Sequence, residues 1–372
     1  MPPNLKLDIF PHIFPQPFFE RMTALTQTNA ALAASIKRWL NIPVLWDLDA
    51  RIKMMDRFKG YKQILTLSLP AIEYLAGPDE SPALARLANE GMAEIVATHP
   101  DYFPAFVASL PMNNVRASLE EMDYAIGKLG ARGIQIFTNV NGRPLDEPEF
   151  YPIFERCVKK YDLPIWVHPA RTQKFADYPT ESKSKYEIWW LFGWPYETSA
   201  FMARMVFSGM LDRLPAMKII THHCGAMAPF FDERIALGMD QMGARTTDED
   251  YGALLKRLSK RPVDLFKMFY ADTSVNGSAP AVRCGLDFFG SKRVLFGTDC
   301  PFDPEGGPMF IRENIRAINS LKLKDADLRR LYYANAIEML RLDLPVKAAP
   351  ARKAKPKART TRRAPAKKKI KR

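Results

Sequence analysis

Eight short apolar runs alternate with helix-like stretches along most of the chain, and this alternation limits the possible folds more than any other feature. The apolar runs cover residues 6–10, 63–69, 103–109, 133–138, 164–168, 218–223, 268–273 and 293–298. Segments with helical periodicity between them include residues 83–98, 115–129, 149–161, 199–211 and 278–289. Runs that are apolar almost throughout are typical of parallel strands covered by helices. The pattern predicts an α/β fold, a (β/α)8 TIM barrel, with a doubly wound sheet as the alternative.

Two connections are too long for simple barrel loops, so we predict helical insertions after the first and fifth strands. Residues 11–61 carry helical periodicity, and residues 170–217 contain an aromatic stretch with Trp189, Trp190 and Trp194. Both connections follow the carboxyl end of a strand, the face on which barrel enzymes build their sites. We expect at least two of these tryptophans to cap the barrel, and Trp190 is the candidate for contact with a substrate.

The positive charge of the chain is concentrated at its carboxyl end. Of 54 Lys and Arg residues, thirteen lie in residues 345–372, which contain no Asp or Glu; the preceding 344 residues carry 41 charges of each sign. This segment repeats Ala, Pro, Lys and Arg and cannot offset its ordering entropy by burial, so we predict a disordered tail. The chain therefore divides into a barrel, 1–344, and a tail, 345–372. The tail either binds polyanions non-specifically and with strong salt dependence, or is a solvated extension.

The sequence favours a cytoplasmic protein. No run approaches the roughly 18 apolar residues of a transmembrane helix, so no membrane role is expected. The first residues lack the basic-then-apolar pattern of a secretory signal. The four cysteines, Cys157, Cys224, Cys284 and Cys300, are widely spaced without a Cys-x-x-Cys pair. Such spacing fits reduced thiols better than a disulfide framework or a zinc ribbon.

Four of the five histidines lie at or just after the carboxyl ends of predicted strands. His12 follows the first strand, His168 ends the fifth, His222 and His223 end the sixth, and Asp299 follows the eighth. In a barrel these ends converge on one mouth, and imidazole with carboxylate is a common ligand set for zinc or manganese. Because side chains alternate along a regular strand, we expect only one of His222 and His223 to face the mouth. The other is expected to pack outward against a helix.

Five motifs in order resemble a known family. They are KLDIFPH (6–12), LPIWVHP (163–169), GWPYET (193–198), HHCGAMAPF (222–230) and LFGTDCPF (295–302). They are similar to the amidohydrolase-related family that includes aminocarboxymuconate-semialdehyde decarboxylase and γ-resorcylate decarboxylase. The resemblance spans residues 6 to about 340.

This resemblance implies a distorted (β/α)8 barrel with one divalent metal, Zn first and Mn as the alternative. It places the metal ligands at positions 10, 12, 168 and 299, and the catalytic histidine at His223, with His222 as a structural partner. Phe10 departs from the family, because phenylalanine cannot bind a metal. Asp8 lies four residues from His12, roughly 13 Å along an extended strand, so it is a poor substitute. His12, His168 and Asp299 remain, and three protein ligands with an open position describe a catalytic zinc site.

The function that the resemblance implies is metal-dependent, non-oxidative decarboxylation, a carbon–carbon lyase reaction, of a small aromatic or unsaturated carboxylic acid. His223 and Asp299 would be the catalytic residues, and the chain is expected to form a homodimer. Arg51 and Arg171 are candidates for clamping the substrate carboxylate, because guanidinium pairs with it bidentately; surface or interdomain ion pairs are the alternative. Hydrolysis of a lactone or amide on the same site is an alternative reaction. A metal-free binding barrel is the alternative that Phe10 favours.

Overall fold

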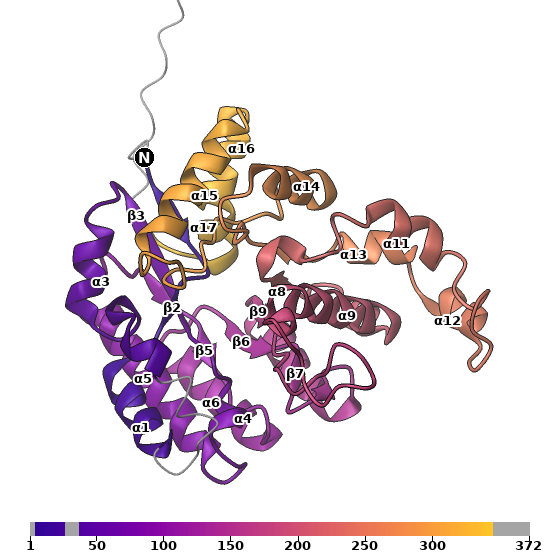
Figure 1. Ribbon diagram of the computed structural model, residues 1–372, viewed down its shortest axis with the longest axis horizontal. Helices are drawn as coiled ribbons and strands as arrows, with labels where there is room; N and C mark the ends of the chain where they lie inside the picture. The colour runs from indigo at the N-terminus through magenta and orange to yellow at the C-terminus, as the bar shows by residue number, and fades with distance from the viewer. Residues whose placement is uncertain (1–3, 27–36, 345–372) are drawn as a thin grey trace, which may run out of the picture.

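The computed structural model describes residues 4–26 and 37–344, and its strands run in parallel around a barrel (Figure 1). The predicted tail, residues 345–372, lies outside the described residues. The barrel strands are β1 (Lys6–Asp8), β2 (His12–Ile13), β3 (Tyr61–Leu67), β4 (Ala105–Phe106), β5 (Ala108–Ser109), β6 (Ile134–Phe137), β9 (Ile165–His168), β10 (Ile219–Thr221) and β11 (Tyr270–Ala271). A short antiparallel hairpin, β7 (Asn139–Val140) and β8 (Arg143–Pro144), lies outside this ring.

Backbone hydrogen bonds close the barrel. One sheet has the order β11-β10-β9-β6-β5, and in the other β1, β2 and β4 all pair with β3. The Val107 N–H donates to Leu65 O at 2.9 Å, which links the two sheets on one side. On the other side, Leu295 N donates to Ala271 O at 2.8 Å and Ile9 N donates to Phe296 O at 2.9 Å. Residues 293–298 therefore take the eighth position, and the predicted (β/α)8 barrel is confirmed.

The barrel is most irregular where its first and last strands meet. Asp8 pairs with Gln63 and His12 pairs with Thr66. The first strand therefore advances by four residues where β3 advances by three. This extra residue is a bulge, which re-aims the side chains that follow it. The eighth strand is reduced to a single bridge between Ala271 and Val294.

Helices cover the outside of the barrel, and their ends follow from local sequence. Asn114 accepts a hydrogen bond from Ala117 N at the start of α6, and Ser278 does the same for Ala281 N at the start of α14. The covering helices are α5 (Ser81–Thr98), α6 (Val115–Gly127), α7 (Tyr151–Arg156), α9 (Gly193–Phe207), α10 (Met210–Arg213), α14 (Ala279–Phe289), α15 (Pro308–Ser320), α16 (Asp325–Arg329) and α17 (Asn335–Leu340).

Both predicted helical insertions are present. The first contains α1 (Gln16–Thr26) and α3 (Leu48–Met55), and the second contains α8 (Ile188–Leu191) and the start of α9. A third long connection, after β10, was not among the predictions. It holds α11 (Asp232–Met239), α12 (Tyr251–Arg257) and α13 (Pro262–Phe266), which project from the side of the barrel (Figure 1).

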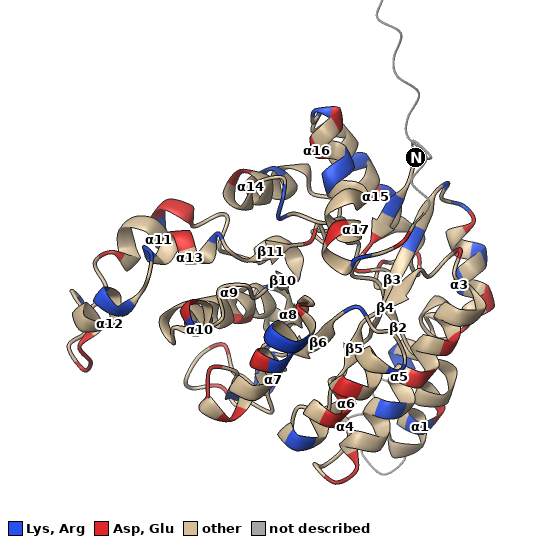
Figure 2. Cartoon of the chain, turned by 180° about the vertical axis from the view of Figure 1, so that it is seen from behind, with Lys and Arg blue, Asp and Glu red and all other residues tan. Residues whose placement is uncertain are grey.

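The barrel interior is tightly packed at the amino ends of its strands. Trp166 is fully buried, and its indole N–H donates to Ile9 O at 2.8 Å across the barrel. Gly133 has a φ of +156°, and a Cβ there would lie 2.5 Å from the Trp166 ring, so only glycine fits. On the outside, basic and acidic residues are interspersed over the helices (Figure 2). Among the described residues, no helix has the length and apolar character needed to cross a membrane.

Candidate metal centre

Strand ends far apart in the sequence bring three imidazoles and a carboxylate together inside the barrel mouth. His12 lies on β2, His168 ends β9, His222 follows β10, and Asp299 follows the eighth strand position. His12 Nε2 lies 3.1 Å from Asp299 Oδ1, and His222 Nε2 lies 3.4 Å from the same oxygen. His12, His168 and His222 each offer one ring nitrogen, and these three atoms lie within 4.8 Å of one another. We call His12, His168, His222 and Asp299 the mouth cluster.

The hydrogen bonds of the cluster leave nitrogen lone pairs pointing inward. His168 Nδ1 lies 2.7 Å from Pro169 O, so Nδ1 carries the proton and Nε2 remains an acceptor. His12 Nδ1 is buried and has no hydrogen-bond partner among the described residues, while its Nε2 faces Asp299 Oδ1 at 3.1 Å. Buried polar atoms without partners are costly unless a ligand satisfies them. Three imidazole nitrogens and a carboxylate oxygen are a suitable donor set for one divalent cation, so the residues present fit a metal.

The expectation that only one of His222 and His223 faces the mouth is wrong. The two rings lie 3.9 Å apart, and both nitrogens of His222 are directed at carboxylates inside the barrel. The physical reason is that β10 ends at Thr221, so strand alternation no longer applies. His223 and Cys224 have φ values of 56° and 58°, a left-handed turn that brings the second imidazole back to the mouth.

Asp272, at the end of β11, holds His222 in place. Its Oδ2 is hydrogen-bonded to His222 Nδ1, while its Oδ1 accepts the N–H groups of Cys224 and Ser274, each at 3.0 Å. Burial opposes charge on His222, but the carboxylates of Asp272 and Asp299 raise its pKa to about 9. A cation bound at Nε2 would displace the proton held there.

The pKa values of the other three groups in the mouth cluster are all lowered, but for different reasons. Burial opposes ionisation of Asp299, but the surrounding imidazoles of His12, His222 and His223 hold its pKa well below the usual range. Burial lowers the pKa of His12, and burial together with the neighbouring histidines lowers the pKa of His168 further. Neutral imidazoles beside an ionised carboxylate are the protonation states that metal binding requires.

His223 stands beside the cluster, nearer the solvent. Its Nε2 lies 3.8 Å from Asp299 Oδ2, its Nδ1 has no hydrogen-bond partner, and 18% of its side chain is exposed. Burial and the nearby His222 lower the pKa of His223. Its position at the open side of Asp299 suits a group that meets a substrate, which is the role predicted for it.

Phe10 lies against the mouth cluster but contributes no ligand atom. It is fully buried, and its ring stacks on His222 with centroids 3.9 Å apart. Asp8 does not replace it: its two oxygens accept hydrogen bonds from Tyr61, Thr298 and the Phe10 N–H. The expectation that Asp8 is no substitute ligand agrees with these contacts.

Arg51 does not reach the mouth as a substrate clamp, so that prediction requires correction. Its side chain is fully buried, with Nε donating to Gln63 Oε1 at 2.7 Å and Nη1 donating to His12 O at 2.7 Å. Nη1 also donates to Val44 O at 3.0 Å. These contacts commit the guanidinium to the polypeptide, where it holds the backbone of His12.

Trp194, rather than Trp190, lines the mouth. The Trp194 ring lies 5.3 Å from His168 and stacks on His223 at 6.1 Å. Trp190 lies behind it, 6.3 Å away, with its indole N–H donating to Glu187 at 2.7 Å. The sequence places both residues in the same aromatic stretch and gives no signal that separates them.

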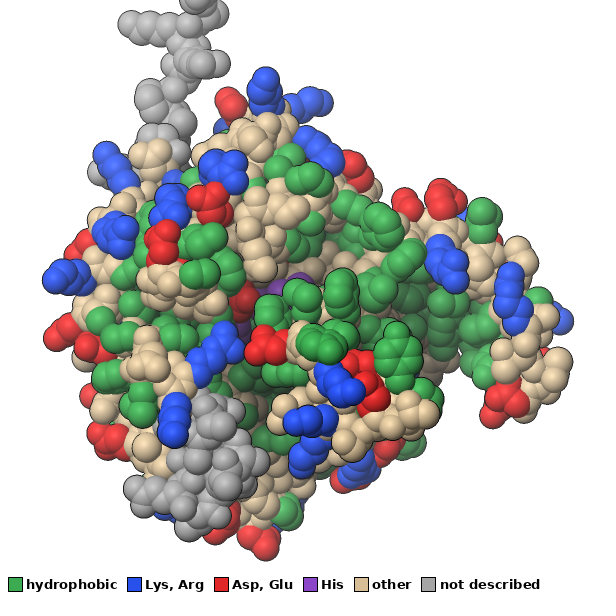
Figure 3. All heavy atoms as spheres, in the orientation of Figure 1, with side chains coloured by type: hydrophobic (Ala, Val, Ile, Leu, Met, Phe, Trp, Pro, Cys, Tyr) green, Lys and Arg blue, Asp and Glu red, His purple; other side chains and the backbone are tan. Residues whose placement is uncertain are grey.

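Two arginines approach this region from the two insertions. Arg171 lies 3.9 Å from a Glu197 carboxylate oxygen, and its side chain is 20% exposed. Arg38, which the sequence did not single out, lies 5.6 Å from the centroid of Phe302, whose ring is in turn 5.5 Å from His12. Figure 3 shows histidine side chains at the bottom of a hollow rimmed by apolar and charged groups.

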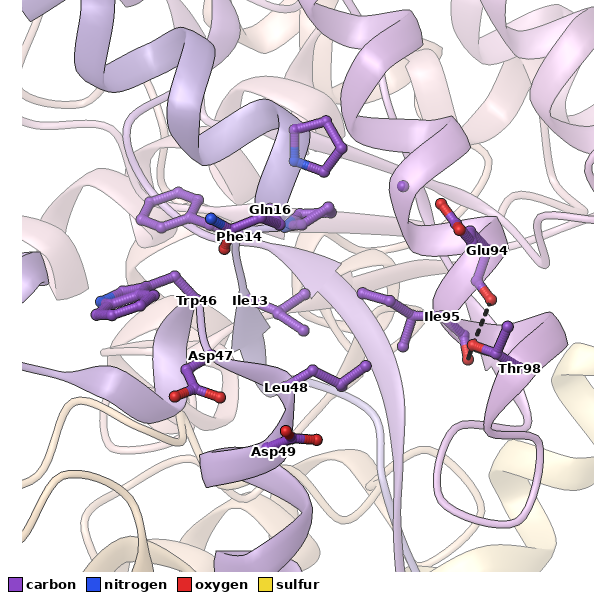
Figure 4. Close-up of a pocket in the computed structure, with 13 residues that line it drawn as sticks. Ile13, Phe14, Gln16, Trp46, Asp47, Leu48, Asp49, Glu94, Ile95 and Thr98 are labelled. Carbon is purple, nitrogen blue, oxygen red and sulfur yellow. Dashed lines mark hydrogen bonds between the residues drawn. The ribbon is translucent and has the colours of Figure 1, made fainter.

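A separate cavity of about 390 Å³ lies between α1, α3 and α5 (Figure 4). Its wall combines apolar and polar side chains, and two of the polar groups serve the helices: Asp47 caps α3, and the Thr98 hydroxyl donates to Glu94 O at 2.8 Å. No residue of the mouth cluster lines it. The chemistry of the barrel therefore lies at the mouth and not in this cavity.

A sequence model of the amidohydrolase family matches residues 42–342. The chain belongs to the amidohydrolase family. Among curated relatives, it is 32% identical over 299 residues to 2-amino-3-carboxymuconate-6-semialdehyde decarboxylase of Dictyostelium discoideum, covering 80% of this chain and 77% of that protein. It is 30% identical to γ-resorcylate decarboxylase of a Rhizobium species, over 76% of this chain and 86% of that protein.

The solved structures of this amidohydrolase family agree with the observed fold. A dihydroxybenzoic acid decarboxylase from Polaromonas, solved with manganese and the inhibitor 2-nitroresorcinol, superposes with a TM-score of 0.70. The two chains are 25% identical, and the match covers 91% of this chain and 97% of that one. The predicted family and barrel fold are confirmed.

Proposed function

We propose that this chain is a metal-dependent, non-oxidative decarboxylase of a small aromatic carboxylic acid. The observation that carries the proposal is the mouth cluster, where imidazole nitrogens of His12 and His222 converge on one carboxylate oxygen, Asp299 Oδ1, at 3.1 and 3.4 Å. The related decarboxylases support it, since two act, by name, on carboxylic acids and one holds manganese. His12, His168 and Asp299 are the proposed metal ligands, as the sequence predicts.

The proposed metal is zinc, with manganese as the alternative. Two imidazoles and one carboxylate form a nitrogen-rich set, which suits zinc, whereas manganese prefers sites richer in oxygen. The Polaromonas relative supports manganese instead. Elemental analysis of protein purified without added metal or chelator tests this choice: one equivalent of zinc supports the proposal, and one equivalent of manganese replaces zinc by the alternative.

In the proposed reaction, the bond between the ring carbon and the carboxylate breaks, CO2 leaves, and the ring carbon takes up a proton. His12, His168 and Asp299 would hold the cation, which would supply positive charge for binding an anionic substrate. His223 and Asp299 are the two groups that can exchange a proton there, because they border the mouth 3.8 Å apart. Proton transfer by a positioned side chain contributes roughly 10²–10⁴-fold to rate.

The walls of the mouth suit an aromatic ring. Trp194 stacks over His223, Phe302 lies against His12, and Phe137 lies 5.5 Å from His168. Flat apolar walls bind a ring by area and by offset stacking. Arg171 and Arg38 are the proposed contacts for an anionic group at the rim, where guanidinium pairs with carboxylate.

The experiment that tests the proposed reaction is release of CO2 from hydroxybenzoates, beginning with γ-resorcylate, by the metal-loaded protein. We expect stoichiometric CO2 and the corresponding phenol. A matched series of lactones and amides is assayed with the same preparation. Ring opening or amide cleavage without CO2 release would replace decarboxylation by hydrolysis. Inactivity on both series together with absence of bound metal would favour a binding barrel instead.

A homodimer is also proposed. Large apolar side chains are exposed on α8, α9 and α11 and in the segments beside them: Tyr186, Leu191, Phe192, Tyr196, Phe230 and Leu237. Clusters of such side chains on a soluble protein indicate interaction surfaces. Light scattering after gel filtration is expected to give twice the chain mass, and a single mass would reject the dimer.

The proposed location is the cytoplasm, supported by four free cysteines, three of them buried. Polyanion binding by residues 345–372 stays a prediction. Deleting those residues should remove salt-sensitive binding to heparin and leave decarboxylation unchanged. Loss of decarboxylation in the deletion variant would contradict this separation.

A further inference from the structure

We infer that His222 is the metal ligand that replaces the one lost at Phe10, so that His12, His168, His222 and Asp299 surround the ion. This inference rests on the metal binding in the proposed function, and it changes the role of His222 from structural partner to ligand. It gives the chain a four-residue ligand set in spite of Phe10.

The first argument is distance. A tetrahedral site with metal–nitrogen distances near 2.1 Å separates its ligand atoms by roughly 3.4 Å. His12 Nε2 and His222 Nε2 lie 3.1 and 3.4 Å from Asp299 Oδ1. His168 completes the group, with its ring centroid 5.0 Å from that of His222 and 5.3 Å from that of His12. His222 therefore stands as close to the shared carboxylate as a ligand of one ion must.

The second argument is the orientation of the ring. Asp272 accepts the hydrogen bond of His222 Nδ1 and is itself fixed by the N–H groups of Cys224 and Ser274. The remaining nitrogen, Nε2, is thereby aimed at Asp299. Metal-binding histidines commonly donate their second N–H to a carboxylate, which fixes both ring plane and tautomer.

The third argument is the packing of Phe10. Its ring covers one face of His222 at a centroid distance of 3.9 Å and an interplanar angle of 24°. The phenyl ring of Phe10 therefore packs against the face of the His222 imidazole that lies toward the first strand, and this contact restricts the orientation of the imidazole. Phe10 thus contributes to the mouth cluster by orienting His222.

His223 provides a matched comparison, because it is the adjacent residue and the same side chain. Its Nε2 is 3.8 Å from the other oxygen, Asp299 Oδ2; its Nδ1 has no hydrogen-bond partner, and 18% of its side chain is exposed. No carboxylate contacts its Nδ1 as Asp272 contacts that of His222. We therefore assign His223 to the substrate and His222 to the metal.

The test measures metal binding without substrate. The full-length apo protein and its His222→Ala and His223→Ala variants are titrated with Zn²⁺ by calorimetry and loaded with Co²⁺ for visible absorption spectra. We expect His222→Ala to lower Zn²⁺ affinity by at least about 100-fold and to change the Co²⁺ spectrum. His223→Ala should bind Zn²⁺ within about threefold of the parent while losing turnover. Equal affinity and identical spectra for His222→Ala and the parent would overturn the inference.

Two further variants keep the test decisive if His222→Ala does not fold. Asp272→Asn preserves size and should lower Zn²⁺ affinity by about 10–100-fold, as loss of a supporting carboxylate does. The double variant Phe10→His with His222→Ala returns a ligand to position 10 and should recover affinity lost by His222→Ala. Unchanged affinity in Asp272→Asn counts against the inference. Absence of both Zn²⁺ and Mn²⁺ binding by the parent protein would reject the proposed function itself, whereas binding independent of His222 would reject only this inference.

Discussion

Two clusters of buried polar groups lie next to each other inside the barrel, and only one has the properties of a site. The mouth cluster comprises His12, His168, His222 and Asp299. The other, which we call the lower network, comprises Asp8, Arg51, Tyr61, Gln63 and Thr298. Asp8 precedes His12 on the first strand and Thr298 precedes Asp299 on the eighth, so the lower network lies one layer toward the amino ends of the strands.

The two clusters differ in the groups that surround their carboxylates. Asp8 accepts four hydrogen bonds, and Gln63 links Arg51 to Tyr61. In the mouth cluster, by contrast, Asp299 is surrounded by imidazoles, with His12 Nε2 and His222 Nε2 at 3.1 and 3.4 Å from its Oδ1. The carboxylates respond accordingly: burial raises the pKa of Asp8 to about 6, while imidazoles hold the pKa of Asp299 well below its usual range despite burial. Burial alone therefore does not identify a site, whereas several imidazole nitrogens around one ionised carboxylate do.

The largest effect on turnover and metal content should come from removing the negative charge of Asp299 in the mouth cluster. Asp299→Asn is expected to lower kcat/KM by about 10³-fold or more and to reduce bound metal, because a ligand and a proton-exchanging group are lost together. Turnover and elemental analysis measure the two effects. Asp240→Asn, which breaks a surface pair with Arg261, is the control and should change neither. Full metal content and activity in Asp299→Asn would remove the distinction between the clusters.

The corresponding change in the lower network should affect stability instead. Asp8→Ala leaves the Tyr61 and Thr298 hydroxyls and two backbone N–H groups without acceptors, at a cost of about 3 kcal/mol in the free energy of unfolding. Urea denaturation measures the loss. Metal content per folded molecule should stay at the level of the parent. A variant that kept its stability but lost its metal would show that the lower network belongs to the site.

A smaller effect, on KM, should distinguish the role of Trp194 from that of Trp190. Trp194→Ala is expected to raise KM by roughly 10-fold, because a stacked aromatic wall contributes about 0.5–1.5 kcal/mol beyond its buried area. Trp190→Ala should change KM less than about twofold, since the ring lies behind Trp194. Steady-state kinetics on the same substrate compare the two variants. The reverse order of effects would restore Trp190 as the substrate contact.

The smallest effect concerns Glu73, a buried carboxyl outside both clusters with one oxygen lacking a partner. Burial raises the pKa of Glu73 to about 8 from an ordinary value of 4.5. Between these pH values the unfolded chain has released the proton and the folded chain has not, so stability falls as pH rises. Glu73→Gln should remove this loss and gain about 1–3 kcal/mol at pH 8.

Urea denaturation at pH 5 and pH 8 measures the difference between the Glu73→Gln variant and the parent. Glu120→Gln, on an exposed pair with Arg116, is the control and should leave the pH dependence as it is. Parallel stability curves for Glu73→Gln and the parent would show that Glu73 is ionised in the fold.

The order of elements, the barrel and three of the four mouth-cluster residues are predictable from sequence, because strand ends converge in any parallel barrel. His222 was misplaced because the strand alternation used for it stops at Thr221, where the chain turns left-handed. The third insertion, α11 to α13, was missed because its helices are short, with 8, 7 and 5 residues.

The sequence by itself determined which chemical groups stand at the strand ends, since apolar runs and the residues after them are local properties. Only the tertiary structure decided which of these groups share a partner and which do not. Arg51, His222 and Trp194 owe their positions to contacts with residues 12 to 50 places away, namely Gln63, Asp272 and His168. Those contacts depend on how the barrel closes, and closure is set by packing and hydrogen bonds summed over the whole chain.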